Sequence, residues 1–86
     1  MISDNMKNRI SLVCYATVSH LFSMYLNEKY RGPNFTWVDF PEKMEEQCEM
    51  QVILNIRPTR NKEEILCHAR DTGREIAGNM VKWMTE

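Results

Sequence analysis

The sequence contains little glycine, little proline and no strong excess of charge. Its 86 residues include three glycines, three prolines, 12 acidic residues and 11 lysines or arginines, which gives a formal net charge of −1. Because 43% of the residues are hydrophobic, the chain can bury enough apolar surface to offset its conformational entropy, which excludes a disordered or collagen-like chain. The near-neutral charge excludes a general electrostatic attraction to nucleic acid or to an anionic membrane.

Cysteine is also scarce, and the three cysteines lie far apart, at Cys14, Cys48 and Cys67. An odd number at wide spacing is a poor framework for disulfide bonds and favours reduced thiols in a cytoplasmic protein. The apolar segment after Arg9 resembles the core of a secretion signal, but polar residues interrupt it and no small-residue cleavage site follows Leu26. It is also shorter than the ~20 residues of a membrane span. We therefore expect a cytoplasmic protein without a membrane segment.

The motifs that carry common chemistries are absent from the sequence. It has no glycine-rich phosphate loop, no C-x-x-C pair and no H-x-x-x-H pair. Cys67 has arginines nearby in the sequence, but no base and orienting group accompany it as a catalytic thiol requires. We therefore expect a protein that is not an enzyme and that binds no metal or cofactor.

Two long segments at the ends of the chain predict helices. The first covers residues 5–28, after an N-cap supplied by residues 3–5 and before the helix-terminating pair Gly32-Pro33. The second covers residues 61–84 and begins with Asn61 and Glu64, an asparagine version of the capping box.

The middle of the chain predicts two strands. Residues 35–40 are dense in aromatic and β-branched side chains, and Pro41 ends that run. Residues 48–57 alternate between apolar and mostly polar side chains, the pattern of a strand with one wet face. Between them, residues 42–47 predict a charged loop, in which one helical turn or a third strand stays open. The expected fold is a single α+β domain over residues 1–86, in the order helix, strand, strand, helix, with an antiparallel β-hairpin against the helices.

The first helix carries two apolar stripes on opposite sides, whereas the last helix carries one. A last helix of this kind packs a single face, which includes Ile76, Met80 and Trp83, on the sheet. The second stripe of the first helix has no evident cover in so small a chain, although the loop or the aromatic strand could fold over it. With a two-stranded sheet that is marginal alone, this predicts a homodimer. The expected dimer or partner interface comprises Leu12, Tyr15, Ser19, Phe22, Leu26, Phe35, Trp37 and Ile53.

A basic segment precedes the last helix. Arg57, Thr59, Arg60 and Lys62 surround its first backbone N–H groups, and helix N-termini attract anions. These four residues therefore form a candidate anion-binding site, and the alternative is a solvated basic loop.

The pattern favours a small non-enzymatic interaction module: an adaptor, an inhibitor or an assembly factor that acts as a homodimer and binds another protein. Its composition is typical of accessory proteins of phages and mobile elements. The alternative is a protein that binds RNA or single-stranded nucleic acid, with Phe35 and Trp37 stacking on bases and the basic segment 57–62 contacting phosphates.

Overall fold

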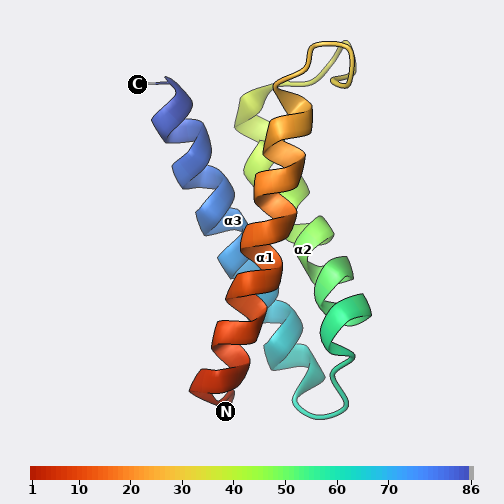
Figure 1. Ribbon diagram of the computed structural model, residues 1–86, viewed down its shortest axis with the longest axis vertical. Coiled ribbons are helices and arrows are strands. Elements are labelled where there is room, and N and C mark those ends of the chain that lie inside the picture. Colours follow the sequence, from red (N-terminus) through yellow and green to blue (C-terminus); the bar gives the residue numbers. More distant parts are fainter. Residues whose placement is uncertain (86) are drawn as a thin grey trace.

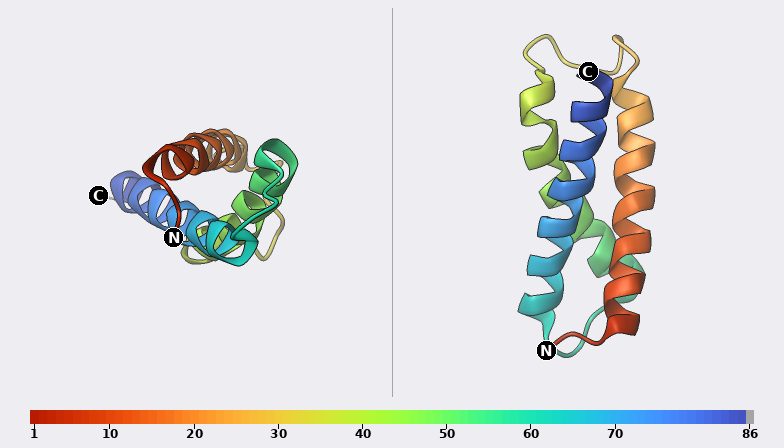
Figure 2. Two further views of the ribbon diagram at one scale, coloured as in Figure 1. Left: turned by 90° about the horizontal axis from the view of Figure 1, so that it is seen from below. Right: turned by 90° about the vertical axis from the view of Figure 1, so that its left-hand side faces the viewer.

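The protein is a bundle of three α-helices, seen in a computed structural model that describes residues 1–85 (Figure 1). The helices are α1 (Asp4–Tyr25), α2 (Phe40–Ile56) and α3 (Lys62–Thr85), and a short 3-10 turn, η1 (Trp37–Asp39), leads into α2. α1 and α3 run in the same direction and α2 runs back between them in the chain (Figures 1 and 2). Seen from one end, the three helices surround a common core (Figure 2).

The expected α+β fold is wrong, because residues 1–85 contain no strand. The predicted second strand, residues 48–57, is the C-terminal part of α2 and the loop residue after it. Its alternation is misleading because Cys48 and Val52, four residues apart, are buried, whereas Met50 and Leu54, each two residues after one of them, are exposed. The spacing of four continues back to Phe40 and Met44, so these residues form one inward stripe of a helix.

The predicted first strand and the loop after it are also wrong. Residues 35–40 form an extended approach, the η1 turn and the first residue of α2, and residues 42–47 lie inside that helix. Pro41 stands in the first turn of α2, where its missing N–H would have no helical partner and its fixed φ suits a helix. Pro41 therefore starts a helix instead of ending a strand, and glutamate, methionine and glutamine, all good helix formers, continue it.

The two outer helices lie where the sequence predicts helices, within three residues at each end. The Ser3 hydroxyl accepts a hydrogen bond of 3.1 Å from the Met6 N–H and caps α1. At the same end of the bundle, α2 stops at Arg57, which adopts a left-handed conformation with φ of 52°. Asn61, directly before α3, is also left-handed, with φ of 54°.

The helices pack most closely where α3 crosses α2. A Cβ atom added to Gly73 of α3 would lie 2.6 Å from the Cys48 Sγ and 2.9 Å from the Cys48 Cβ. Gly73 is therefore required here for its lack of a side chain, and with it α2 and α3 form the most extensive helix pair. The predicted packing of the last helix on a sheet is replaced by this helix-to-helix contact.

Two free cysteines lie in this part of the core. The Cys14 thiol of α1 donates to the Ala69 carbonyl oxygen at 3.5 Å, and the Cys48 Sγ lies 3.9 Å from the Cys14 carbonyl oxygen. The contact with the Cys14 thiol, together with burial, raises the pKa of Cys48, which therefore stays protonated. Both side chains act as small apolar groups of the core.

Two ion pairs flank the contact between α2 and α3. Arg70 Nη1 lies 3.0 Å from Glu49 Oε2, and Arg74 Nη2 lies 2.7 Å from Glu45 Oε2. The Arg74 Nε donates to the same Glu45 oxygen at 3.0 Å. All four side chains reach across from one helix to the other, so polar groups cover the apolar interior of this contact on its solvent side.

Candidate interaction surfaces

Three residues of the expected interface are packed inside the chain. Phe22, Phe35 and Trp37 are half-buried and form, with Tyr25 and Phe40, a set of tilted and edge-on ring contacts that we call the aromatic cap. The Phe22 ring centroid lies 5.4 Å from that of Trp37, and the Phe35 centroid lies 5.1 Å from that of Trp37. These rings therefore pack against each other within the chain instead of forming a separate exposed patch.

The other five residues of that set lie on or next to two different helices. Leu12 and Tyr15 of α1 and Leu26 directly after it are exposed, and Ile53 is exposed on the outer side of α2. Ser19 of α1 is half-buried, and its hydroxyl oxygen has no hydrogen-bond partner within residues 1–85. The structure therefore does not bring all eight residues together in one surface.

A largely apolar surface instead lies between α1 and α3, where Thr72 and Asn79 lie among the apolar side chains. We call it the α1–α3 face, and it consists of Leu12, Tyr15, Ile76, Met80 and Trp83. Leu12, Tyr15 and Trp83 are 72%, 60% and 79% exposed. The C-terminal half of α3 leans away from α1 (Figure 1), so the side chains between them are left with water on one side.

Three residues of the α1–α3 face, Ile76, Met80 and Trp83, were absent from the expected interface. The sequence places all three on the packed side of the last helix, and the periodicity alone cannot tell a side chain at the edge of that side from one at its centre. Ile76 and Met80 are half-buried, whereas Trp83 comes after the point at which α3 diverges. A large exposed tryptophan is the strongest signal for a binding surface here.

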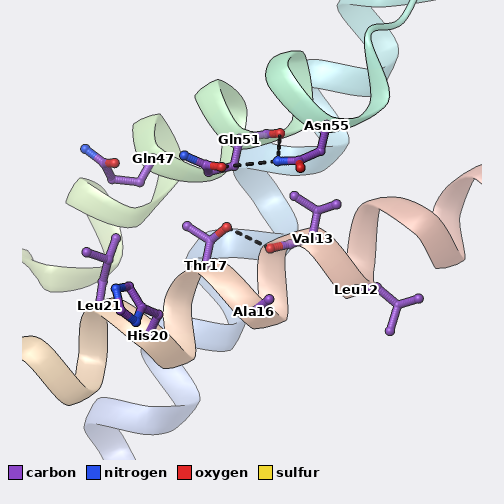
Figure 3. Close-up of a pocket in the computed structure, with 9 residues that line it drawn as sticks. All are labelled: Leu12, Val13, Ala16, Thr17, His20, Leu21, Gln47, Gln51 and Asn55. Carbon is purple, nitrogen blue, oxygen red and sulfur yellow. Dashed lines mark hydrogen bonds between the residues drawn. The ribbon is translucent and has the colours of Figure 1, made fainter.

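The other side of α1 borders a groove against α2 (Figure 3). Along α2 it presents the amides of Gln47, Gln51 and Asn55, and the Asn55 Nδ2 donates to the Gln51 carbonyl and side-chain oxygens at 2.7 Å and 3.1 Å. Leu12 points away from α2 in this view and thus towards the α1–α3 side. No carboxylate, lysine or arginine lines the groove, and its amides are partly engaged with each other.

The candidate anion-binding residues lie together at the end of the bundle where α2 meets α3. Arg57, Thr59 and Arg60 line a depression of about 420 Å³, and Lys62 is the first residue of α3. The predicted capping box is not formed there, since Asn61 caps no backbone N–H within residues 1–85 and Glu64 instead pairs with the N-terminal amine at 3.2 Å. The structure adds Arg9 of α1 to this group, and no sequence pattern predicts that Arg9 lies near residues 57–62.

Comparisons with known proteins identify no relative. No protein family model, no curated protein and no solved structure matches this chain. Within residues 1–85, no group of three or more histidine, cysteine, aspartate or glutamate side chains is arranged to hold a metal ion. None of the three helices is both long and apolar enough to cross a membrane. The function must therefore be argued from the surfaces themselves.

Proposed function

We propose that this protein is a non-enzymatic interaction module that pairs with a second copy of itself through the α1–α3 face. The observation that carries the proposal is the exposure of Leu12, Tyr15 and Trp83, two of them aromatic, along one face between two helices. Contiguous apolar side chains of this size are costly to leave in water and are typical of association surfaces.

A second copy suits this face because the face is almost without charge. From Ile10 to Leu26, α1 and the residue after it contain no aspartate, glutamate, lysine or arginine. Glu75 is the one carboxylate that lines the depressions along the face, and no lysine or arginine lines them. In a two-fold dimer each copy presents the same patch to the other. A patch with charges of one sign would therefore repel the same patch on the second copy, and the α1–α3 face avoids this repulsion. A charged partner would find little with which to pair.

The dimensions of the bundle also fit a dimer. A stable interface buries about 800 Å² on each partner, and the chain exposes 6074 Å² in total. The bundle measures 40 × 24 × 16 Å, and α1 lies along its broad side (Figure 1). An interface of that size would occupy about one eighth of the exposed surface of each copy.

Analytical ultracentrifugation of the wild-type chain between about 1 and 100 μM tests the proposal. We expect a dimer in the upper part of this range. The double variant Leu12→Glu with Tyr15→Glu should sediment as a monomer with unchanged far-UV circular dichroism, because both side chains are exposed in the single chain and the new charges would face each other in the dimer.

The matched control is Ile53→Glu with Leu54→Glu on the outer side of α2, where both residues are exposed apolar side chains as well. This variant should remain dimeric. A wild-type chain that stays monomeric throughout the range would refute self-association, and a control variant that dissociates as readily as the test variant would move the interface away from the α1–α3 face.

A further inference from the structure

The six arginines of the chain fall into two groups. Arg31, Arg70 and Arg74 each lie within 3.7 Å of a carboxylate oxygen. The remaining three, Arg9, Arg57 and Arg60, form no ion pair within residues 1–85. These three line the same depression at the end of the bundle, although Arg9 belongs to α1 and the other two lie after α2.

The residues that line this depression include basic side chains but no acidic ones. Glu64, an acidic residue at the start of α3, is held by the N-terminal amine at 3.2 Å. Three exposed arginines therefore line one site that has no carboxylate of its own, and their hydrogen-bond donors are not engaged by another side chain of residues 1–85.

The floor of the depression is apolar. It is formed by side chains from all three helices and from the loop between α2 and α3, and most of them are only half-buried. These floor residues are Ile2, Met6, Ile56, Pro58 and Ile65. A ligand that fills the depression would thus need an anionic group that binds the arginines and an apolar part that contacts the floor.

We propose that this depression binds a small soluble phosphate ester whose body is apolar. Guanidinium groups bind phosphate oxygens through paired, charge-assisted hydrogen bonds, which are stronger than those between neutral groups. The Thr59 hydroxyl at the rim supplies a further donor. The site lies apart from the α1–α3 face and shares no lining residue with it, so it binds its ligand whether or not the chain dimerises.

Titration with phenyl phosphate, followed by ¹H–¹⁵N NMR of the full chain, tests this site. We expect saturable shifts of the backbone signals of residues 2–9 and 56–61, and a higher affinity for phenyl phosphate than for inorganic phosphate because the ring covers the apolar floor. Phenol, which lacks the phosphate, should cause no saturable shift there. The variant Arg57→Gln with Arg60→Gln should weaken phenyl phosphate binding at least about tenfold, since it removes two charged donors.

The control is Lys29→Gln with Lys43→Gln, which removes the same charge from exposed positions at the opposite end of the bundle. This variant should bind phenyl phosphate as the wild type does. Equal weakening in both variants would show a general charge effect and overturn the site, as would the absence of saturable shifts in the wild type up to 10 mM phenyl phosphate or shifts centred elsewhere in the bundle.

Discussion

The two contacts that α3 makes along the bundle differ in how completely they are closed. Against α2, Gly73 brings the helices together over Cys48, and the pairs Arg70–Glu49 and Arg74–Glu45 cover the contact. Against α1, the same helix diverges and leaves Tyr15 and Trp83 exposed, with no ion pair between α1 and α3 in residues 1–85.

The difference shows which contact is complete within one chain. Small residues and complementary charges specify the α2–α3 contact, and they leave little apolar surface for another molecule. The α1–α3 contact also has small residues where Cys14 meets Ala69, but no ion pair covers it within residues 1–85, and its large exposed side chains fit a surface that is completed by association. Mutations in the α2–α3 contact should therefore change the stability of the single chain, whereas mutations of the α1–α3 face should change its association.

The largest expected effect comes from truncating a leucine in the closed interior. Leu66→Ala on α3, at a side chain 5% exposed, should lower the free energy of unfolding by about 2–5 kcal/mol, because it removes buried methyl groups and leaves a cavity. Leu12→Ala, on the open side, should change it by less than about 0.5 kcal/mol. Urea unfolding at low protein concentration measures both, and similar losses at the two leucines would abolish the distinction between the contacts.

Thiol reactivity should show the same distinction. Iodoacetamide should modify the exposed Cys67 in the native protein and should modify the buried Cys48 at least about a hundredfold more slowly. Cys48 reacts only when the bundle opens locally, and a free energy of opening of about 2.8 kcal/mol would expose its thiol in about 1% of the molecules. The raised pKa of Cys48 adds to this protection because the thiolate is the reactive form. Mass spectrometry over time gives the two rates, and their equality would mean that the α2–α3 contact opens readily.

The two glycines of α3 provide a matched pair of smaller effects. Gly73→Ala should lower the free energy of unfolding by about 1–2 kcal/mol, because the new Cβ collides with Cys48 and this outweighs the gain in helix propensity. Gly78→Ala should raise it by up to about 1 kcal/mol, because nothing lies within 4 Å of the new Cβ. Thermal and urea unfolding of both variants measure the sign, and a stabilising Gly73→Ala would contradict the close approach of α2 and α3.

The smallest expected effect belongs to the ion pair between Arg74 and Glu45. A double-mutant cycle with Arg74→Gln and Glu45→Gln should give a favourable coupling smaller than the effects of the glycine variants, since the Arg74 side chain is 62% exposed and water weakens the attraction. The coupling should fall at 1 M NaCl, where the screening length is about 3 Å. A coupling that does not respond to salt would show that the pair acts through packing and not through charge.

The wrong assignment of α2 has a specific physical origin. Side chains four residues apart share a helix face, but they are also an even number apart, so they share a strand face as well. The apolar residues at Met50 and Leu54, which are exposed in the helix, completed the apparent alternation with Cys48 and Val52. Extending the pattern back to Phe40 and Met44, and giving weight to the helix formers in residues 42–47, would have favoured the helix.

The candidate surfaces were partly accessible to the same reasoning. The second apolar stripe of α1 identified Leu12 and Tyr15. In a helical projection these two residues lie opposite the stripe that fills the core, so they are recognised as surplus apolar side chains. Trp83 and Arg9 could not be found in this way. Their roles depend on where α3 diverges and on which side of α1 faces the loop after α2, and both are properties of the packed bundle.

The sequence alone determined the two outer helices, because caps, breakers and a period of 3.6 residues act locally along the chain. It also determined that α1 carries more apolar surface than its own core needs. Only the tertiary structure decided that Phe22 and Trp37 fill an aromatic cap, that α3 diverges from α1, and that three unpaired arginines meet at one end. These features depend on contacts between different elements of the chain, which no local pattern specifies, and the apolar surface buried in those contacts stabilises them.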